Sequence, residues 1–481
     1  MSEKHCCFIA VLVLLITVVV CFYSTLRAGF VSDDYFLINR VASEGFYSGW
    51  GGNGSVFFRP ATTLTFLFDH SIWGTSSAGF HLTNLFWHLF AGIGLFLLYF
   101  LVMKQLPIIK PCLYATLSSV LFLVLASHSE SVAWVSGRTD IIATVLCIAS
   151  LYFFYRQLNK KSILFSTLAL LLFPIGLLAK ESVIITPLLW GLFLAYSSPS
   201  RGENLRRNLT LIGFSTLIAV AYFSFRIILG DGLVSGIRYG GFLDLSPAGF
   251  AENLVRYTLR VLLPPFPPGL RGVVTENPII VLLFFVLLVL PVSILVYRRA
   301  EQKKKNLLFL MTGCFFASLL PVLGMKVSLF DTQSERFLYL PGVFASGFFT
   351  VAMISLFKES KLALILLICV IFLQGIFLHR SNENWAHAGR LCSTIAQSVS
   401  EHDADSVYIL AIPDSYRGAY VFRNGLNEAV AMLKGGEPDY IVLYKISSYG
   451  DSLISENVNL IDLDETERTV ITCVDGRMQS I

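Results

Sequence analysis

Long apolar runs recur along the chain as far as Leu378, and short charged connections separate them. Of the 481 residues, 55% are hydrophobic and 14% are charged. Soluble domains carry about 25% charged residues, so this composition excludes an ordinary soluble protein. A run of about 20 apolar residues crosses the hydrocarbon core of a bilayer as a helix. The sequence therefore predicts a mainly α fold, built as a polytopic membrane helix bundle.

Hydropathy over windows of about 20 residues indicates about eleven spans. They are Phe8–Ser24, Phe80–Met103, Cys112–Ser127, Ile141–Tyr155, Ile163–Leu178, Val183–Tyr196, Leu209–Leu229, Pro278–Tyr297, Asn306–Gly324, Phe337–Phe357 and Leu362–Leu378. The first run also has the form of a secretory signal. The residues after it fit a cleavage site poorly, which favours an uncleaved first span.

Basic residues gather in alternate connections. These connections hold Lys104 and Lys110; Arg156, Lys160 and Lys161; Arg201, Arg206 and Arg207; Arg298, Arg299, Lys303, Lys304 and Lys305; and Lys358 and Lys361. Cytoplasmic loops are enriched in Lys and Arg, so we assign these connections and the N-terminus to the cytoplasm. The opposite connections and the tail then lie outside. We expect a multi-pass integral protein of a bacterial inner (plasma) membrane with an extracytoplasmic C-terminal domain.

The acid and base motifs fall on the outer side, although the spans follow from hydropathy alone. These motifs contain Asp33, Asp34, Arg59, His128, Glu130, Arg138, Asp140, Lys180, Glu181, Glu335 and Arg336. A carboxylate beside lipid is costly and tends to be retained for function. The pattern indicates an enzyme that works at the edge of a bilayer. The formal net charge of +4 is spread over many connections and does not suggest nucleic-acid binding.

Two adjacent carboxylates, Asp33 and Asp34, follow the first span. In a partly desolvated loop their repulsion raises the pKa of one of them and makes it a proton acceptor near neutral pH. A helix cap or an interfacial turn explains the pair equally well. His128 and Glu130 allow a metal site, but structural hydrogen bonds explain them better. We assign no metal ligand and no cofactor, and the need for a divalent metal stays open.

Three cations, Arg138, Lys180 and Arg336, lie at the outer ends of predicted spans, at the depth of lipid phosphates. Fixed cations in a dry setting stabilise a phosphate leaving group. Snorkelling toward lipid headgroups is the alternative for each one alone. Each has an acidic residue within two positions, however, and snorkelling requires no such partner.

Two outer segments are candidates for the membrane interface: the apolar Ala61–Trp73, and Leu254–Leu263 with Arg256 and Arg260 exposed. An ordinary surface helix explains the second segment equally well.

Composition divides the chain into a membrane domain, residues 1–379, and a small soluble α/β domain, residues 380–481. Patterning predicts tail helices at Asn384–Glu401 and Gly425–Leu433 and strands at Val407–Ile412, Tyr440–Ile446, Val458–Leu463 and Thr469–Val474. Aromatic and Arg residues in Pro413–Gly425 suit carbohydrate or phosphate contact. A structural loop that docks the tail on the membrane part is the better explanation.

Several motifs together resemble the GT-C glycosyltransferases, which depend on lipid-linked sugars. They read SDDYFLINR, FRPATTLTF, HSESVAWVSGRTDIIATVL, AKESVIITPLL, SERFLYLP and RSNENW. The likeness is greatest to the transmembrane and tetratricopeptide-repeat O-mannosyltransferases and their bacterial relatives, from Met1 to about Trp385. The tail departs from that family, because it has no tetratricopeptide period.

The resemblance implies an inverting transfer of a sugar, with mannose as one candidate, from a polyprenyl-phosphate carrier. The acceptor would be a hydroxyl of a protein or glycan on the outer or luminal face. The implied catalytic residues are Asp33 and Asp34, and the implied donor-phosphate ligands are Arg138, Lys180 and Arg336. The implied supporting residues are Arg59, His128, Glu130, Asp140, Glu181 and Glu335.

A transporter or flippase of lipid-linked sugars is the alternative from another class. Pro174, Pro187, Pro291 and Pro321 interrupt predicted spans, as in transporters. No internal repeat is found, however, and the charges lie at one rim. A non-catalytic scaffold gives no reason to gather acids and cations on one face.

Overall fold

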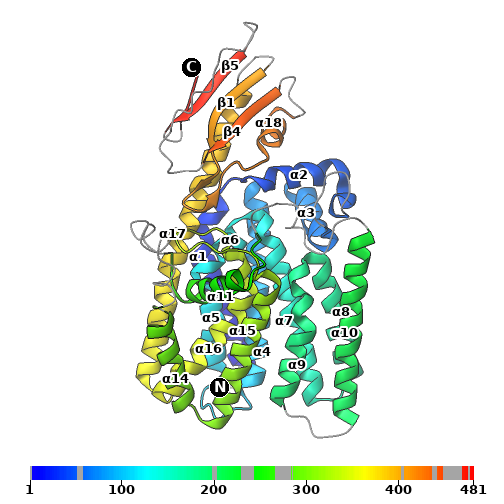
Figure 1. The fold of residues 1–481 in the computed structure, drawn as a ribbon, viewed down its shortest axis with the longest axis vertical. Helices are drawn as coiled ribbons and strands as arrows, with labels where there is room; N and C mark the ends of the chain where they lie inside the picture. The colour runs from blue at the N-terminus through cyan, green and yellow to red at the C-terminus, as the bar shows by residue number, and fades with distance from the viewer. Residues whose placement is uncertain are drawn as a thin grey trace.

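The structure is a computed structural model that describes residues 3–50, 58–197, 203–228, 243–265, 283, 285–401, 406–435, 441–447, 468–474 and 477–480. Helices make up most of it (Figure 1). In chain order they include α1 (Glu3–Phe22), α2 (Asp33–Glu44), α3 (Pro60–Trp73), α4 (Ser77–Met103), α5 (Pro111–Leu123), α6 (Ser129–Ala133), α7 (Arg138–Asn159), α8 (Ile163–Ala179), α9 (Thr186–Ser197), α10 (Glu203–Ile228), α11 (Pro247–Leu262), α14 (Leu290–Arg299), α15 (Gln302–Leu319), α16 (Tyr339–Phe357), α17 (Lys361–Ser400) and α18 (Leu426–Lys434). Short helical turns include η4 (Val135–Gly137), η5 (Glu181–Ile185) and η10 (Glu335–Leu338).

The described residues contain seven helices that are long and apolar enough to cross a membrane, and eight if the bent pair Pro111–Leu123 and Ala126–Ala133 forms one span. Two shorter apolar helices, Ile163–Ala179 and Glu181–Ser197, lie beside them. The protein is thus a polytopic helix bundle, as predicted. The count of eleven spans stays a prediction, since part of Pro278–Tyr297 lies outside the described residues.

Helix α1 shows which apolar side chains of a span pack inside the bundle and which remain at its surface. Its buried residues Cys6, Ala10, Leu14, Val18 and Phe22 recur at every fourth position and form one stripe. This stripe faces α4 and α5. Large apolar side chains on the other sides remain exposed. In water, each square ångström of such surface costs about 25 cal/mol. A lipid environment removes that cost.

Helix α17 joins the membrane bundle to the tail. It begins after Ser360, whose hydroxyl accepts a hydrogen bond from the backbone N–H of Ala363, and it runs for 40 residues. That length is about 60 Å, about twice the thickness of the hydrocarbon core. The sequence predicted a span to Leu378 and a separate helix from Asn384. One continuous helix forms instead, because the connecting residues include no Gly or Pro. The division into residues 1–379 and 380–481, which this helix crosses, stays a prediction.

Along the chain, α2 and α3 lie between the spans that contain α1 and α4, and α11 lies between those that contain α10 and α15. The predicted interfacial segments form α3 and most of α11. Arg256 donates to Glu252 on α11. Arg260 was expected to be exposed, but it is buried and forms an ion pair with the buried Glu335. The buried carboxylate requires a cation, so the expectation for Arg260 was wrong.

The tail contains a four-stranded sheet in the order β4-β1-β5-β6. Strand β1 (Ser406–Pro413) is parallel to β4 (Ile441–Ser447) and β5 (Arg468–Val474), whereas β6 (Arg477–Ser480) is antiparallel to β5. Strands β1, β4 and β5 and helix α18 match predicted elements, whereas β6 was not predicted. The predicted strand Val458–Leu463 lies outside the described residues. A two-stranded hairpin, β2 (Ser415–Tyr416) and β3 (Ala419–Tyr420), follows β1.

A shared hydrophobic cluster packs the tail on the end of the bundle that carries the acid and base motifs. It includes Tyr35 of α2, Trp134 beside η4, Trp385 of α17, and Tyr420 and Phe422 of the tail. The ring of Trp134 lies 6.2 Å from that of Trp385 and 5.0 Å from that of Tyr420. The tail is therefore part of the surroundings of the outer motifs.

Candidate active site

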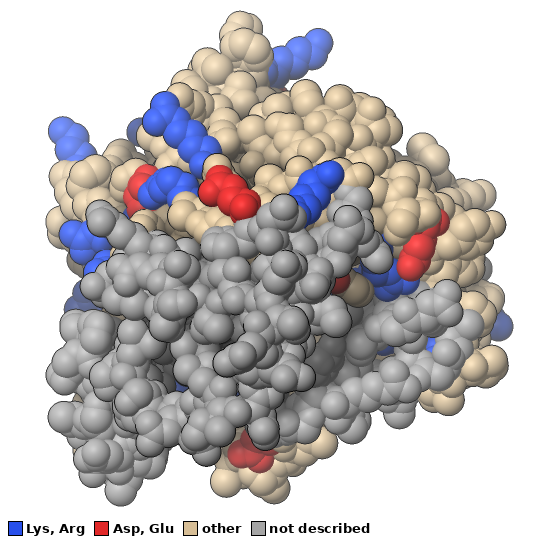
Figure 2. Space-filling model, turned by 90° about the horizontal axis from the view of Figure 1, so that it is seen from above, with Lys and Arg blue, Asp and Glu red and all other residues tan. Residues whose placement is uncertain are grey.

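The outer motifs lie at helix ends on the side of the bundle that carries the tail. Helix α7 begins with Arg138, Lys180 directly follows α8, and Arg336 precedes α16. Seen from above, acidic and basic side chains lie next to one another on this face (Figure 2).

The carboxylate of Asp34 connects the start of α2 to the segment before α7 through hydrogen bonds. One carboxylate oxygen accepts hydrogen bonds from the backbone N–H (2.8 Å) and the hydroxyl (2.6 Å) of Ser136. The other accepts from the backbone N–H of Val31 (3.1 Å). Burial raises the pKa of Asp34 to about 7, although these hydrogen bonds partly offset the rise. Asp34 therefore changes its charge near neutral pH.

Asp33 has different surroundings. Its side chain is only partly buried and accepts a hydrogen bond from the amide of Asn424 in the tail. Both aspartates lie in the first turn of α2, where the helix dipole favours negative charge. The residue before the helix is Ser32, so neither aspartate is its cap. Of the two carboxylates, only that of Asp33 is open to an approaching acceptor.

Arg138 is fully buried and engaged by protein groups. It forms a 2.5 Å ion pair with Asp69 and donates to the side-chain oxygen of Asn84 at 2.6 Å. It also donates to Thr65 and to the carbonyl of Phe80. Each of its three side-chain nitrogens thus has a protein partner. This arrangement favours a role in holding α3, α4 and α7 together over contact with a ligand's phosphate.

Lys180 and Arg336 come together around the ring of Phe337. The ammonium of Lys180 lies 5.3 Å from the ring centre and the guanidinium of Arg336 lies 4.9 Å from it. Lys180 forms a 2.6 Å ion pair with Asp140. Arg336 pairs with Glu130, which also accepts from the backbone N–H of Arg336 at 2.9 Å. Two of the three predicted phosphate ligands are therefore neighbours.

A second group of charges adjoins Lys180. Arg59 forms a 2.9 Å ion pair with Glu181, and Arg226 lies 3.9 Å from the other oxygen of Glu181. Arg226 is 1% exposed, and none of its side-chain nitrogens has a hydrogen-bond partner among the residues that the structure describes. Sequence reasoning placed Arg226 inside a span and missed it. An Arg in an apolar run was the available signal.

Of the other predicted site residues, His128 packs in the core of the bundle. His128 is buried, with its ring 4.6 Å from that of Phe122 and 4.5 Å from that of Tyr339. It packs in the core and does not join Glu130 at a shared ligand position. Within the described ranges, no group of three or more His, Cys, Asp and Glu side chains is arranged to hold a metal ion.

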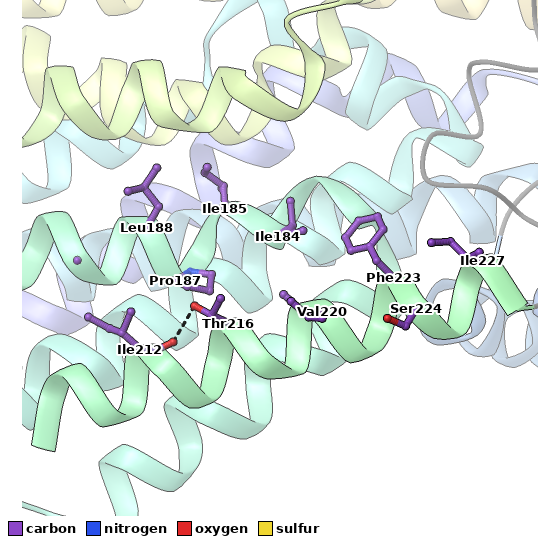
Figure 3. Close-up of a pocket in the computed structure, with 12 residues that line it drawn as sticks. Ile184, Ile185, Pro187, Leu188, Ile212, Thr216, Val220, Phe223, Ser224 and Ile227 are labelled. Carbon is purple, nitrogen blue, oxygen red and sulfur yellow. Dashed lines mark hydrogen bonds between the residues drawn. The ribbon is translucent and has the colours of Figure 1, made fainter.

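An apolar groove of about 690 Å³ runs between α9 and α10. Its lining includes Ile184, Pro187, Gly191, Val220, Phe223 and Ile227, and side chains from both sides face one another across it (Figure 3). Ile184 belongs to η5, which begins with Glu181, and Arg226 directly precedes Ile227. One end of the groove is therefore beside the charges of Glu181 and Arg226. We call Arg59, Lys180, Arg226 and Arg336 the cation cluster.

Comparison with solved structures identifies the architecture. ArnT from Cupriavidus metallidurans bound to undecaprenyl phosphate matches with a TM-score of 0.52 and 13% identity, over 92% of this chain and 90% of ArnT. Its apo state matches with a TM-score of 0.50 and 13% identity, over 89% of each chain. The chain has an ArnT-like fold. The predicted GT-C-like helix bundle is thereby confirmed.

Comparison of the sequence finds local similarity to two curated proteins. The chain is 32% identical over 130 residues to protein O-mannosyl-transferase F38B6.6 of Caenorhabditis elegans, which is 25% of the chain and 18% of that protein. It is 30% identical over 196 residues to protein O-mannosyl-transferase Tmtc1 of Drosophila melanogaster, 36% of the chain and 21% of that protein. The chain thus spans about a fifth of the length of these curated relatives. No protein-family model matches it. The predicted resemblance to O-mannosyltransferases is confirmed.

Replacement of Arg138 tests its structural role. Arg138→Ala leaves Asp69 buried without its cation, so we expect a loss of about 3–5 kcal/mol in the free energy of unfolding. Lys326→Ala is the control, because it removes a cation whose side chain is 62% exposed and whose partner Glu252 also lies at the surface. Thermal unfolding in detergent should show a large decrease for the first variant and a small one for the second. Unchanged stability of Arg138→Ala, together with lost donor binding, would return Arg138 to the phosphate ligands.

Proposed function

We propose that this protein is an inverting glycosyltransferase that moves a sugar from a polyprenyl-phosphate carrier to a hydroxyl acceptor at the outer membrane face. The observation that carries the proposal is the apolar groove that ends beside the cation cluster. An isoprenoid chain offers apolar surface along its length and a charged phosphate at one end. The groove and the cluster offer the complementary surfaces in the same order. ArnT, whose fold this chain resembles, has been crystallised with undecaprenyl phosphate.

The donor phosphate takes its charge partners from the cation cluster. Arg226 has unpartnered N–H groups among the described residues, and Lys180 adds a second charge. Because both are largely buried, their attraction for a phosphate is stronger than in water. That attraction increases as negative charge develops on the departing phosphate, so it lowers the barrier.

Transfer proceeds as a single displacement. The acceptor oxygen forms a bond to the anomeric carbon while the bond from that carbon to the phosphate oxygen breaks, and its electron pair stays on the phosphate. The acceptor proton passes to the carboxylate of Asp33, the partly exposed member of the aspartate pair. Attack opposite the leaving group inverts the anomeric configuration. Asp34 acts as a positioning residue, because its hydrogen bonds hold the start of α2.

The names of the sequence relatives suggest the finer assignment. Both are protein O-mannosyl-transferases, which favours mannose as the sugar and a protein hydroxyl as the acceptor. The distribution of basic loops favours a cytoplasmic N-terminus and an outer site. Transfer of labelled mannose from polyprenyl-phosphate mannose to peptides, by the protein reconstituted in vesicles, tests the whole proposal. No transfer to any hydroxyl acceptor, from mannose or other polyprenyl-phosphate sugars, would refute it.

Removal of a cluster charge tests the phosphate site. Arg226→Ala should lower kcat/KM for the donor about 100-fold or more, as removal of one preorganised charge partner does in other enzymes. Folding should persist, since Glu181 keeps Arg59 as its cation. Lys326→Ala is the matched control, because Lys326 is a surface cation with a side chain 62% exposed. Equal activity of the two variants in the transfer assay would remove Arg226 from the site.

Obstruction of the groove tests the carrier site. A Cβ added at Gly191 or at Gly213 meets no atom within 4 Å, but only Gly191 lines the groove. We expect Gly191→Trp to raise KM about tenfold or more for a long-chain donor, with a smaller effect on a donor with a two-isoprene chain. Gly213→Trp, on the same pair of helices, should leave both values near those of the unsubstituted protein. An equal effect of both substitutions would show that the groove does not hold the carrier.

The pKa of Asp34 predicts a pH dependence. Below pH 7 the carboxyl gains a proton and loses an acceptor position toward Ser136 or Val31, so transfer at pH 6 should be about a tenth of the plateau reached above pH 8. Since its folded-state pKa is raised, Asp34 contributes stability at low pH that is lost as pH rises through about 7. Acid unfolding driven by Asp34 is therefore not expected. Asp34→Asn should give low transfer with no acid limb, and a retained limb would assign it to another group.

A further inference from the structure

One short segment of the tail contacts two loops of the candidate site that are far apart in the sequence. Tyr420 of β3 donates a hydrogen bond to Glu130 (2.7 Å) and accepts one from Arg336 (2.8 Å). Asn424, four residues later, donates to Asp33 and accepts from the hydroxyl of Ser32 (2.8 Å). One short segment of the tail thus contacts both the cation cluster and the loop that carries the aspartates. We call residues 418–425 the bridge segment.

Two glycines bring the bridge segment this close. Gly418 has φ +93°, and an added Cβ would collide with the backbone nitrogen of Thr332, in the loop that leads to Arg336. Gly425 has φ +82°, and its Cβ would collide with the carbonyl oxygen of Ser32, directly before Asp33. Both positions have a positive φ, which residues other than glycine adopt at a cost in free energy. Both also lack room for a Cβ atom. Each end of the bridge segment is therefore fitted to one of the two site loops.

The polar contacts are enclosed by aromatic rings. Tyr420 packs edge-on against Trp134 and Trp385, with ring centres at 5.0 and 5.5 Å. Burial raises the pKa of Tyr420, although Arg336 lowers it in part, so the hydroxyl keeps its proton and donates to Glu130. Arg423 covers the other part of the ring at 4.2 Å and pairs with Asp414 at 3.5 Å. A hydrogen bond to a charged group in such a setting is stronger than one in water.

We infer that the bridge segment is part of the active site, with Tyr420 as the positioning residue for Arg336 and Asn424 as the positioning residue for Asp33. The inference rests on the proposed function, in which Arg336 and Asp33 act on opposite sides of the anomeric carbon. The bridge segment links the two loops in addition to the bonds that Ser136 donates to Asp34. A rigid link fixes the spacing between the leaving group and the base, and a misplacement of about 1 Å lowers rates about 100-fold.

Tyr420→Phe tests the link, because it removes the hydroxyl and keeps the ring. We expect kcat to decrease about tenfold or more, with KM for the donor within about threefold and a loss of about 1–3 kcal/mol in the free energy of unfolding that leaves the protein folded under assay conditions. Tyr416→Phe is the matched control from the other strand of the hairpin, where the ring packs against His387 at 4.2 Å. Its kcat should stay within about twofold of that of the unsubstituted protein.

A double-mutant cycle separates positioning from simple packing. If Tyr420 acts through Arg336, Tyr420→Phe should have little further effect on kcat in an Arg336→Ala background. Gly418→Ala supplies an independent variant, which displaces the hairpin from Thr332 without removing a polar group and should also lower kcat. Wild-type kcat for Tyr420→Phe, or additive effects in the cycle, would overturn the inference while the proposed function stands. Absence of transfer by the unsubstituted protein would overturn both.

Discussion

Charge at the boundary of a membrane must be compensated, and this requirement organises the end of the bundle that carries the tail. Removal of an ion from water costs several kcal/mol unless a partner and hydrogen bonds replace the water. The structure meets this cost with ion pairs between distant segments: Arg138 with Asp69, Lys180 with Asp140, and Arg260 with Glu335. Each pair joins two different elements and so holds the loops between spans in place. Arg226 differs, since it is buried without a hydrogen-bond partner among the described residues. A buried cation with unmet N–H groups is where the charge of a ligand is expected.

The sequence could predict what depends on composition and order, but not what depends on pairing in space. Apolar runs and the spacing of charges predicted the bundle, the outer motifs and the tail strands, because these follow from local hydropathy and period. The same reasoning grouped Arg138 with Lys180 and Arg336, since all three lie at span ends. Their different surroundings depend on which helices pack together, which one sequence does not reveal. Arg226 was hidden within an apolar run. Arg260 was interpreted as exposed because its partner, Glu335, is 75 positions away.

The tail was harder to predict for a related reason. Its strands are marked by short runs of β-branched and other apolar residues, but nothing local marks Tyr420 or Asn424 as neighbours of Glu130 and Asp33. Docking of the tail was the favoured interpretation of Pro413–Gly425, and the shared cluster of aromatic rings agrees with it. The hydrogen bonds of Tyr420 and Asn424 show that the docked tail also contacts the candidate site. Helix α17 makes this docking precise, because a continuous helix carries the tail from the bundle with no flexible joint before Ser400.

The groove and the bridge segment lie on different parts of the chain, so the proposed function separates recognition of the carrier from recognition of sugar and acceptor. An isoprenoid chain offers only apolar surface, and a change of one methylene alters binding by about 1–3 kcal/mol. In the proposed function, the groove therefore selects a carrier by length and shape but scarcely by chemistry. Hydrogen-bonding sites discriminate more strongly, because a wrong ligand leaves buried polar groups unpaired. Such groups here come from the outer loops and the tail. The ArnT-like fold is shared at 13% identity over 92% of the chain. Under the proposed function, selection for a particular sugar and acceptor acts on the loops that carry the acid and base motifs and on the bridge segment, while the proposed carrier groove is kept.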